Sequence, residues 1–258
     1  MTTSKHGGKI QKKLRKEKVM NTIKFNKKNV KMVAHRGVSG LERENTNAAF
    51  VAAGNRSYFG VETDLYRTID GHYVLLHDGN LQRVGNDALD IPNSTLDTIR
   101  HAVLLDKDGT NDRYDLRVPT LLEYIKICKR YEKYCVLELK GDFPEEQIKE
   151  MVEIINTQDY LDHVIFISFW FGSLVTLRKV LPKQKAQFLC GEISEEFLQN
   201  TIDNKFDLDI HYGCLTDDMI KRFHDAGLEV NVWTVDNPEI AEQLVERGVD
   251  YITSNILE

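Results

Sequence analysis

The sequence holds few cysteines, and none of them form close pairs. In 258 residues there are four, without a CxxC motif, at Cys128, Cys135, Cys190 and Cys214. Small secreted domains stabilised by disulfides carry a dense cysteine framework instead. We therefore expect reduced thiols in a reducing compartment, and the cytoplasm is the expected location.

Long apolar runs are missing as well. No stretch approaches the ~20 consecutive apolar residues of a transmembrane helix, and the N-terminus lacks the apolar core of a signal peptide. The sequence therefore predicts no transmembrane segment. It leaves the oligomeric state open.

Excess positive charge is absent from the chain as a whole, whose formal net charge is -6. Binding to a phosphate backbone needs a basic face, so we expect no nucleic-acid partner. Residues 1–31 are the local exception, with eleven Lys or Arg against one acid, Glu17. We expect them to form a basic N-terminal arm. It is either a solvated tail or a segment that binds anionic lipid or nucleic acid.

What is present is the composition of a globular protein with a large core, 41% hydrophobic and 29% charged. After residue 31, short β-type runs alternate with helical patterns, which is typical of parallel sheets built from βα units. Eight strands are expected, at 32–34, 61–65, 135–139, 164–168, 186–190, 208–210, 229–234 and 251–253. Seven helices are expected between them, at 46–57, 120–132, 144–156, 172–181, 194–204, 216–226 and 237–247. Residues 32–258 therefore predict one (β/α)8 barrel domain of the α/β class.

A further β-type run at 73–76 follows the second strand after a turn at Asp70-Gly71, which is too short for a parallel crossover. It is expected to return as a β-hairpin above the carboxyl-terminal rim and to bring His77 to that rim. Residues 77–118 form an irregular insertion with one short helix near 96–104. Long connections of this kind usually cover an active site.

Ionisable residues gather at the carboxyl ends of four expected strands. They are His35, Arg36, Glu62, Asp64, Glu138, Lys140 and His211. The chemistry of a (β/α)8 barrel is assembled from such strand ends on one face. Glu62 and Asp64 are two residues apart and project to the same side of their strand, where Glu138 can join them.

Three carboxylates without a nearby histidine or cysteine ligand form a hard oxygen site, suited to Ca²⁺ or Mg²⁺. The alternative is that some of them form ion pairs at the rim. His35 and His77 suit general acid and base catalysis near neutral pH. Arg36 and Lys140 supply positive charge for a phosphate.

Seven segments, in order, resemble the glycerophosphodiester phosphodiesterase family, in its compact bacterial form. They read AHRGVSGLERENTNAAF at 34–50, GVETDLYRTIDGHYVLLHDGNLQRV at 60–84, VPTLLEYI at 118–125, LELK at 137–140, ISF at 167–169, VNVWTVDNPE at 230–239 and GVDYITSN at 248–255. The resemblance implies a TIM barrel of the phosphatidylinositol-phosphodiesterase type. Arg43 departs from the family's usual proline, and His211 has no clear counterpart.

The resemblance also implies roles for individual residues. His35 and His77 resemble the catalytic acid/base pair, and the metal ligands match Glu62, Asp64 and Glu138. The substrate-binding positions match Arg36, Lys140, Glu44 and Trp233. Glu44 is alternatively an acid at the start of the next helix, and Trp233 a core residue.

The activity implied is metal-dependent hydrolysis of a small-molecule glycerophosphodiester to an alcohol and sn-glycerol 3-phosphate, with Ca²⁺ or Mg²⁺ as the cofactor. Two alternatives stay open. One is a phospholipase C- or D-type enzyme that acts on lipid or lysolipid headgroups. The other is a barrel without catalytic activity that binds phosphorylated glycerol compounds.

Overall fold

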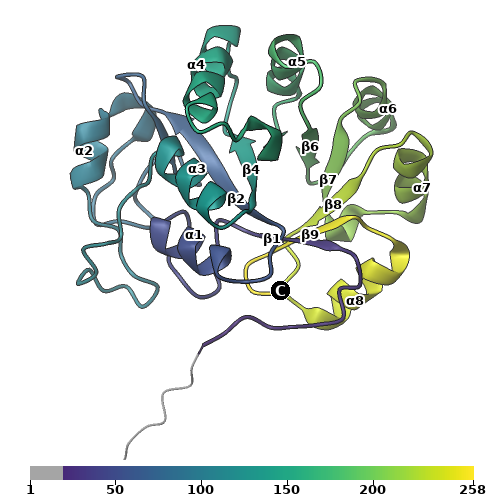
Figure 1. Ribbon diagram of the computed structural model, residues 1–258, viewed down its shortest axis with the longest axis horizontal. Coiled ribbons are helices and arrows are strands. Elements are labelled where there is room, and N and C mark those ends of the chain that lie inside the picture. Colours follow the sequence, from purple (N-terminus) through teal and green to yellow (C-terminus); the bar gives the residue numbers. More distant parts are fainter. Residues whose placement is uncertain (1–19) are drawn as a thin grey trace, which may run out of the picture.

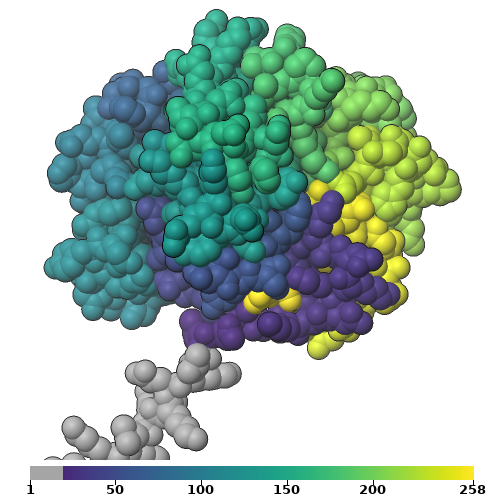
Figure 2. All heavy atoms as spheres, in the orientation of Figure 1, coloured from purple at the N-terminus to yellow at the C-terminus, as the bar shows by residue number. Residues whose placement is uncertain are grey.

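The computed structural model describes residues 20–258. Most of the expected basic arm, residues 1–19, lies outside the described residues. The described part begins with a segment that packs on the barrel. There, the Ile23 amide donates to the Ile256 carbonyl at 3.0 Å, and the Glu258 amide donates to Ile23 at 2.9 Å. Figure 2 shows the C-terminal residues in yellow beside this purple segment.

Eight parallel strands close into a barrel, as the sequence predicts (Figure 1). Each strand pairs with the next, and β1 pairs with both β2 and β9, which closes the ring. The strands are β1 (Lys31–Ala34), β2 (Gly60–Arg67), β4 (Tyr134–Leu139), β5 (Val164–Ser168), β6 (Ala186–Cys190), β7 (Asp207–His211), β8 (Val230–Trp233) and β9 (Tyr251–Ser254). The (β/α)8 prediction is therefore confirmed.

Helices surround the strands, with α4 to α7 following one another around the ring in Figure 1. The helices between strands are α1 (Asn47–Gly54), α3 (Leu121–Arg130), α4 (Glu145–Asn156), α5 (Phe171–Val180), α6 (Glu195–Asp203), α7 (Asp217–Asp225) and α8 (Pro238–Arg247). Their ends follow the capping rules: Thr120 and Glu123 form a capping box at the start of α3. Helix α8 starts with Asn237 as its N-cap and ends at Gly248, whose φ of 93° is left-handed.

Apolar side chains fill two layers. The larger layer lies between the strands and the helices and includes Phe50, Phe166, Phe206 and Phe223. The smaller layer fills the barrel interior, with Val33, Val136, Ile165, Ile167, Leu189 and Tyr251. The barrel interior is therefore a packed core. Among residues 20–258, no helix is long and apolar enough to cross a membrane.

The hairpin and the insertion form as expected. Strand β3 (Tyr73–Leu75) pairs antiparallel with the end of β2. The insertion holds a 3₁₀ turn, η1 (Ile91–Asn93), and one helix, α2 (Leu96–His101). Two further 3₁₀ turns, η2 (Leu161–His163) and η3 (Tyr212–Cys214), precede β5 and follow β7.

The insertion has an apolar core of its own, which includes Val74, Leu81, Ile91, Ile99 and Leu116. Helix α2 is shorter than the expected 96–104, because Ala102 is extended and Leu104 forms a bridge with Gly85.

Replacing Leu81 by alanine should lower the free energy of unfolding by about 2–5 kcal/mol, because it leaves a cavity in the insertion core. Leu81 is fully buried, whereas Ile69 on the neighbouring hairpin is 62% exposed. Ile69→Ala should change that free energy by no more than about 0.5 kcal/mol. Urea unfolding of both variants measures the difference. Equal losses would contradict a separate packed core.

Candidate active site

A cavity of about 200 Å³ opens where the carboxyl ends of the strands converge. Its lining is formed by His35, Arg36, Glu62, His77, Glu138, Ile167, Phe169, Leu189, Asp209, Trp233 and Thr253. Six of the predicted site residues line it directly. The other three contact that lining: Lys140 lies 3.0 Å from Glu138, Glu44 lies 2.9 Å from Arg36, and Asp64 lies 3.6 Å from Arg36.

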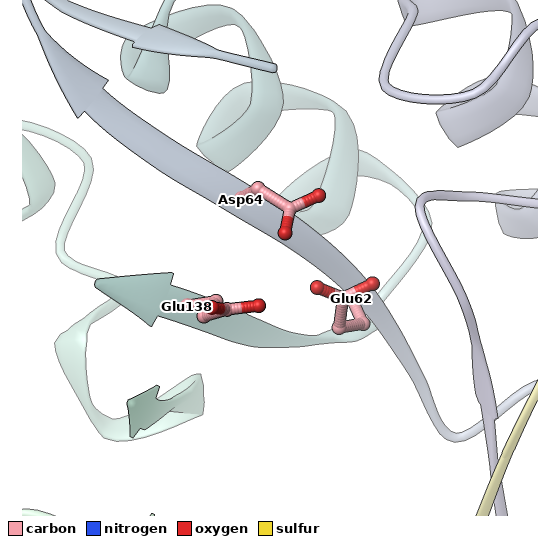
Figure 3. A group of neighbouring side chains, drawn as sticks. All are labelled: Glu62, Asp64 and Glu138. Carbon is pink, nitrogen blue, oxygen red and sulfur yellow. The ribbon is translucent and has the colours of Figure 1, made fainter. Parts of the chain in front are cut away.

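The three predicted metal ligands come together at one point (Figure 3). Glu62 and Asp64 share a side of β2 because successive side chains of a strand alternate. The parallel register of β2 and β4 places Glu138 opposite Asp64. One oxygen atom from each carboxylate lies within 4.8 Å of the others, and all three residues are buried.

This crowding of carboxylates changes their protonation. Burial, with repulsion from Asp64, raises the pKa of Glu138 to about 8 and also raises the pKa of Glu62. Burial also acts against ionisation of Asp64, but Lys140 and Arg36 outweigh it and lower the pKa of Asp64 to about 2. Three ionised carboxylates at this distance need a further cation.

The donor set fits such a cation. Within residues 20–258, the buried Asp64 Oδ1 and Glu138 Oε1 accept no hydrogen bond, and each faces the Lys140 ammonium, at 3.4 and 3.0 Å. A carboxylate oxygen with one charged neighbour keeps a lone pair that can coordinate a cation. All the donors are oxygen atoms, which suits Ca²⁺ or Mg²⁺ better than zinc. Glu62, Asp64 and Glu138 are therefore the residues that can hold a divalent cation.

Backbone geometry at Arg36 and Gly37 shapes the first loop of the site. Arg36 adopts a left-handed φ of 53°, and its amide donates to Glu62 Oε2 at 2.8 Å. Gly37 has a φ of 74°, and a Cβ there would lie 2.7 Å from Ala49. Glycine is therefore required after Arg36, which explains the HRG sequence in physical terms. Arg43, the departure from the family pattern, fixes this loop to the insertion by donating to the carbonyls of Leu105 and Asp106.

His35 is held by a hydrogen bond on one ring nitrogen. Its Nδ1 lies 2.7 Å from Asn255 Oδ1, while Asn255 Nδ2 donates to Asp236 at 2.6 Å. Because Asn255 donates to Asp236 through Nδ2, its Oδ1 must accept from His35, so Nδ1 is the protonated nitrogen of His35. The other ring nitrogen, Nε2, lies 4.0 Å from Glu62 and is the acceptor. Burial, with the neighbouring Arg36, lowers the pKa of His35 to about 4.

His77 is held in a similar way from the insertion. Its Nδ1 lies 2.9 Å from Asp78, which accepts a hydrogen bond from Arg83 Nε at 2.7 Å. Arg83 also forms two 2.7 Å hydrogen bonds to Glu44. Burial, with Arg36 and Lys140, lowers the pKa of His77, although Asp64 opposes this shift. Both histidines thus line one cavity, His35 from the end of β1 and His77 from the loop that follows β3.

Trp233 lines the cavity, and Glu44 contacts Arg36 of the lining. Glu44 joins Arg36 to Arg83, and these arginines outweigh burial and lower its pKa to about 2. The ring of Trp233 packs edge-on against Phe169 at 5.7 Å and against His211 at 5.5 Å. His211 does not line the cavity; it supports the wall that Trp233 forms.

Sequence reasoning missed several residues of the site. Asn255 and Asp78, which hold the two histidines, were not singled out, although each lies in a segment that resembles the family. Asp209 was missed as well. Alternation along β7, where Leu208 and Ile210 face the helices, could have identified it as an inward-facing acid. It lines the cavity, and burial raises its pKa to about 8.

The sequence matches a known protein family and individual members of it. The family described as "Glycerophosphoryl diester phosphodiesterase family" matches residues 35–257. A glycerophosphodiester phosphodiesterase of Caldanaerobacter subterraneus is 28% identical over 229 residues, which cover 87% of this chain and 93% of that protein.

Solved structures agree as well. A phosphodiesterase of Oleispira antarctica, in complex with the product sn-glycerol-3-phosphate, has a TM-score of 0.80 at 27% identity, covering 88% of this chain and 93% of that chain. A glycerophosphodiester phosphodiesterase of Parabacteroides distasonis, with the same identity and coverage, has a TM-score of 0.74. The family match covers seven of the eight barrel strands, the insertion and all the residues that line the cavity, and the chain therefore belongs to the glycerophosphoryl diester phosphodiesterase family.

Proposed function

We propose that this protein hydrolyses glycerophosphodiesters to an alcohol and sn-glycerol 3-phosphate, using two histidines and a divalent cation. One observation carries the proposal. Two histidines and Arg36 line one small cavity in a chain of this family, and the carboxylate cluster and Lys140 lie at it. The Oleispira antarctica relative holds this product, which supports the same product here.

Arg36 and Lys140 are the proposed phosphate contacts. Arg36 lines the cavity, and Lys140 lies beside Glu138 at its edge. Asp64 and Glu138 outweigh burial and raise the pKa of Lys140, so it is charged at neutral pH. Fixed positive groups in a buried site stabilise the charge that develops on phosphoryl oxygens during the reaction.

The proposed acid and base are His35 and His77. Asn255 and Asp78 fix the proton on each Nδ1, so each Nε2 is the atom that takes up or releases a proton. One histidine removes a proton from the attacking hydroxyl or water, and the other gives a proton to the leaving alcohol.

The proposed metal ligands are Glu62, Asp64 and Glu138. A divalent cation, Ca²⁺ or Mg²⁺, would supply Lewis-acid polarisation of a phosphoryl oxygen there. We propose the cytoplasm as the location, because Cys128, Cys135, Cys190 and Cys214 are free thiols and three of them are buried.

The test of the activity uses the purified protein, stripped with a chelator, and three substrates: glycerophosphocholine, glycerophosphoethanolamine and glycerophosphoglycerol. Metal-dependent release of glycerol 3-phosphate after adding Ca²⁺ or Mg²⁺ is expected. Binding of the product without turnover would instead indicate a barrel without catalytic activity.

Replacing either His35 or His77 by alanine should lower turnover by about 10²–10⁴-fold, because each removes a group that transfers a proton. His101→Ala is the matched control, since His101 is exposed on α2 and should leave turnover unchanged. Steady-state rates with saturating metal measure the effect. Wild-type turnover in either variant would refute the assignment of that histidine.

Replacing Glu62 by glutamine should weaken Ca²⁺ or Mg²⁺ binding by at least ~10–100-fold. That is the usual loss when a residue that only orients a metal ligand is mutated, and here the ligand itself is changed. Without metal, the variant should be no less stable than the wild type, because one of three repelling carboxylates is gone. Calorimetric titration and thermal unfolding with and without metal measure both effects. Glu153→Gln, on the exposed face of α4, is the control; equal metal affinity in both variants would exclude Glu62 as a ligand.

A further inference from the structure

A groove of about 740 Å³ lies on the catalytic rim, between the loops that follow β5 and β6. Its apolar lining, here called the aromatic groove, consists of Phe169, Trp170, Phe171, Phe188, Ile193 and Phe197. The groove is larger and more open than the catalytic cavity, and the mechanism above makes no use of it.

Three of these rings are exposed to solvent. Phe169 is 41% exposed, Trp170 47% and Phe197 44%. Beneath them, Phe171 packs edge-on against Phe188 at 5.2 Å and against Phe197 at 5.9 Å, so the floor of the groove is preformed. Aromatic rings gathered in one groove in this way are suited to contact an apolar ligand, whereas single scattered apolar residues would need no explanation.

The groove is continuous with the catalytic cavity. Phe169 lines both spaces, and its ring contacts Trp233 on the cavity wall at 5.7 Å. An apolar chain attached to a substrate in the cavity can therefore pass over Phe169 and lie along the groove without crossing a polar barrier.

The charged residues at the groove indicate which kind of ligand it can bind. Its charged lining residues are Asp142 and Glu192, and within the described chain no lysine or arginine lines it. Two carboxylates disfavour an anionic bilayer or a nucleic acid. A single uncharged hydrocarbon chain is compatible with both the apolar floor and the acidic edge.

We propose that the aromatic groove binds the hydrocarbon chain of a glycerophosphodiester that carries one acyl or alkyl group, a lysoglycerophospholipid. This inference rests on the proposed function and extends its substrate class. The reaction is the same hydrolysis: water forms a new P–O bond, the P–O bond to the headgroup alcohol breaks, and that alcohol leaves with a proton. The other product is then an acylglycerol phosphate.

Binding can be tested apart from catalysis, because the chain holds only two tryptophans, Trp170 and Trp233. In Trp233→Phe, Trp170 is the sole fluorophore. The probes are acylglycerol 3-phosphates of increasing chain length, below their critical micelle concentrations. The emission of Trp170 should shift to the blue, and affinity should rise by up to about four-fold per added methylene until the groove is filled. Affinity that does not depend on chain length would overturn the proposal.

Catalysis gives the second test, with Trp170→Ala and Phe197→Ser as variants. Each should lower kcat/KM for lysophosphatidylcholine by roughly 10-fold or more and leave kcat/KM for glycerophosphocholine unchanged, because only the first substrate reaches the groove. Tyr114→Ala is the control, since Tyr114 is 77% exposed and lies outside the groove. An equal loss on both substrates would overturn the proposal.

Two further outcomes are distinguishable. If no substrate is hydrolysed but affinity still rises with chain length, the proposed function fails and the groove assignment stands. A different result would be that the variants no longer co-sediment with phosphatidylcholine vesicles but keep their activity on both substrates, while the affinity for monomeric probes does not depend on chain length. The groove would then contact a bilayer, and the proposal would be wrong.

Discussion

The organisation of the site depends on negative charge that β2 and β4 bury at their carboxyl ends. Glu62, Asp64 and Glu138 lie too close together to be ionised at once without compensation. Burial, together with repulsion from Asp64, accordingly raises the pKa of Glu138 to about 8. Lys140 and Arg36 offset part of the charge, chiefly at Asp64. The remaining charge is offset either by protonation, which the raised pKa of Glu138 favours, or by a bound cation, so the carboxylates that repel one another are also suited to hold a metal ion.

The insertion is part of this charge balance. Arg36 reaches from the first loop to Glu44, Glu44 binds Arg83 of the insertion, and Arg83 binds Asp78, which orients His77. One histidine is therefore positioned by a network that depends on the packing of the insertion, whereas His35 is positioned by Asn255 at the end of β9. The apolar core around Leu81 belongs to the same insertion, so its packing supports the position of His77.

The order of strands and helices and the alternation of residues along the strands made the barrel and the carboxylate cluster predictable from the sequence. The alternation of β2 puts Glu62 and Asp64 on one side, and parallel order places Glu138 next to them, so the carboxylate cluster follows from the pattern of strands. The partners of the histidines do not follow in this way. Asn255 lies 220 residues from His35 in the sequence, and a contact of that separation exists only once the barrel has closed. The aromatic groove was missed for the same reason, because two separate loops build it.

The cavity has two unlike walls. The polar wall consists of Arg36, Glu62, Glu138 and the two histidines, and the apolar wall consists of Ile167, Leu189, Phe169 and Trp233. Asp209 looks like an exception on the apolar wall, but burial raises its pKa to about 8, so it is protonated at neutral pH. The apolar wall therefore carries no charge that would repel a phosphate. With Arg36 and Lys140 as the proposed phosphate contacts, a phosphodiester would be held at the polar wall, and its uncharged part would be directed toward Phe169 and the aromatic groove.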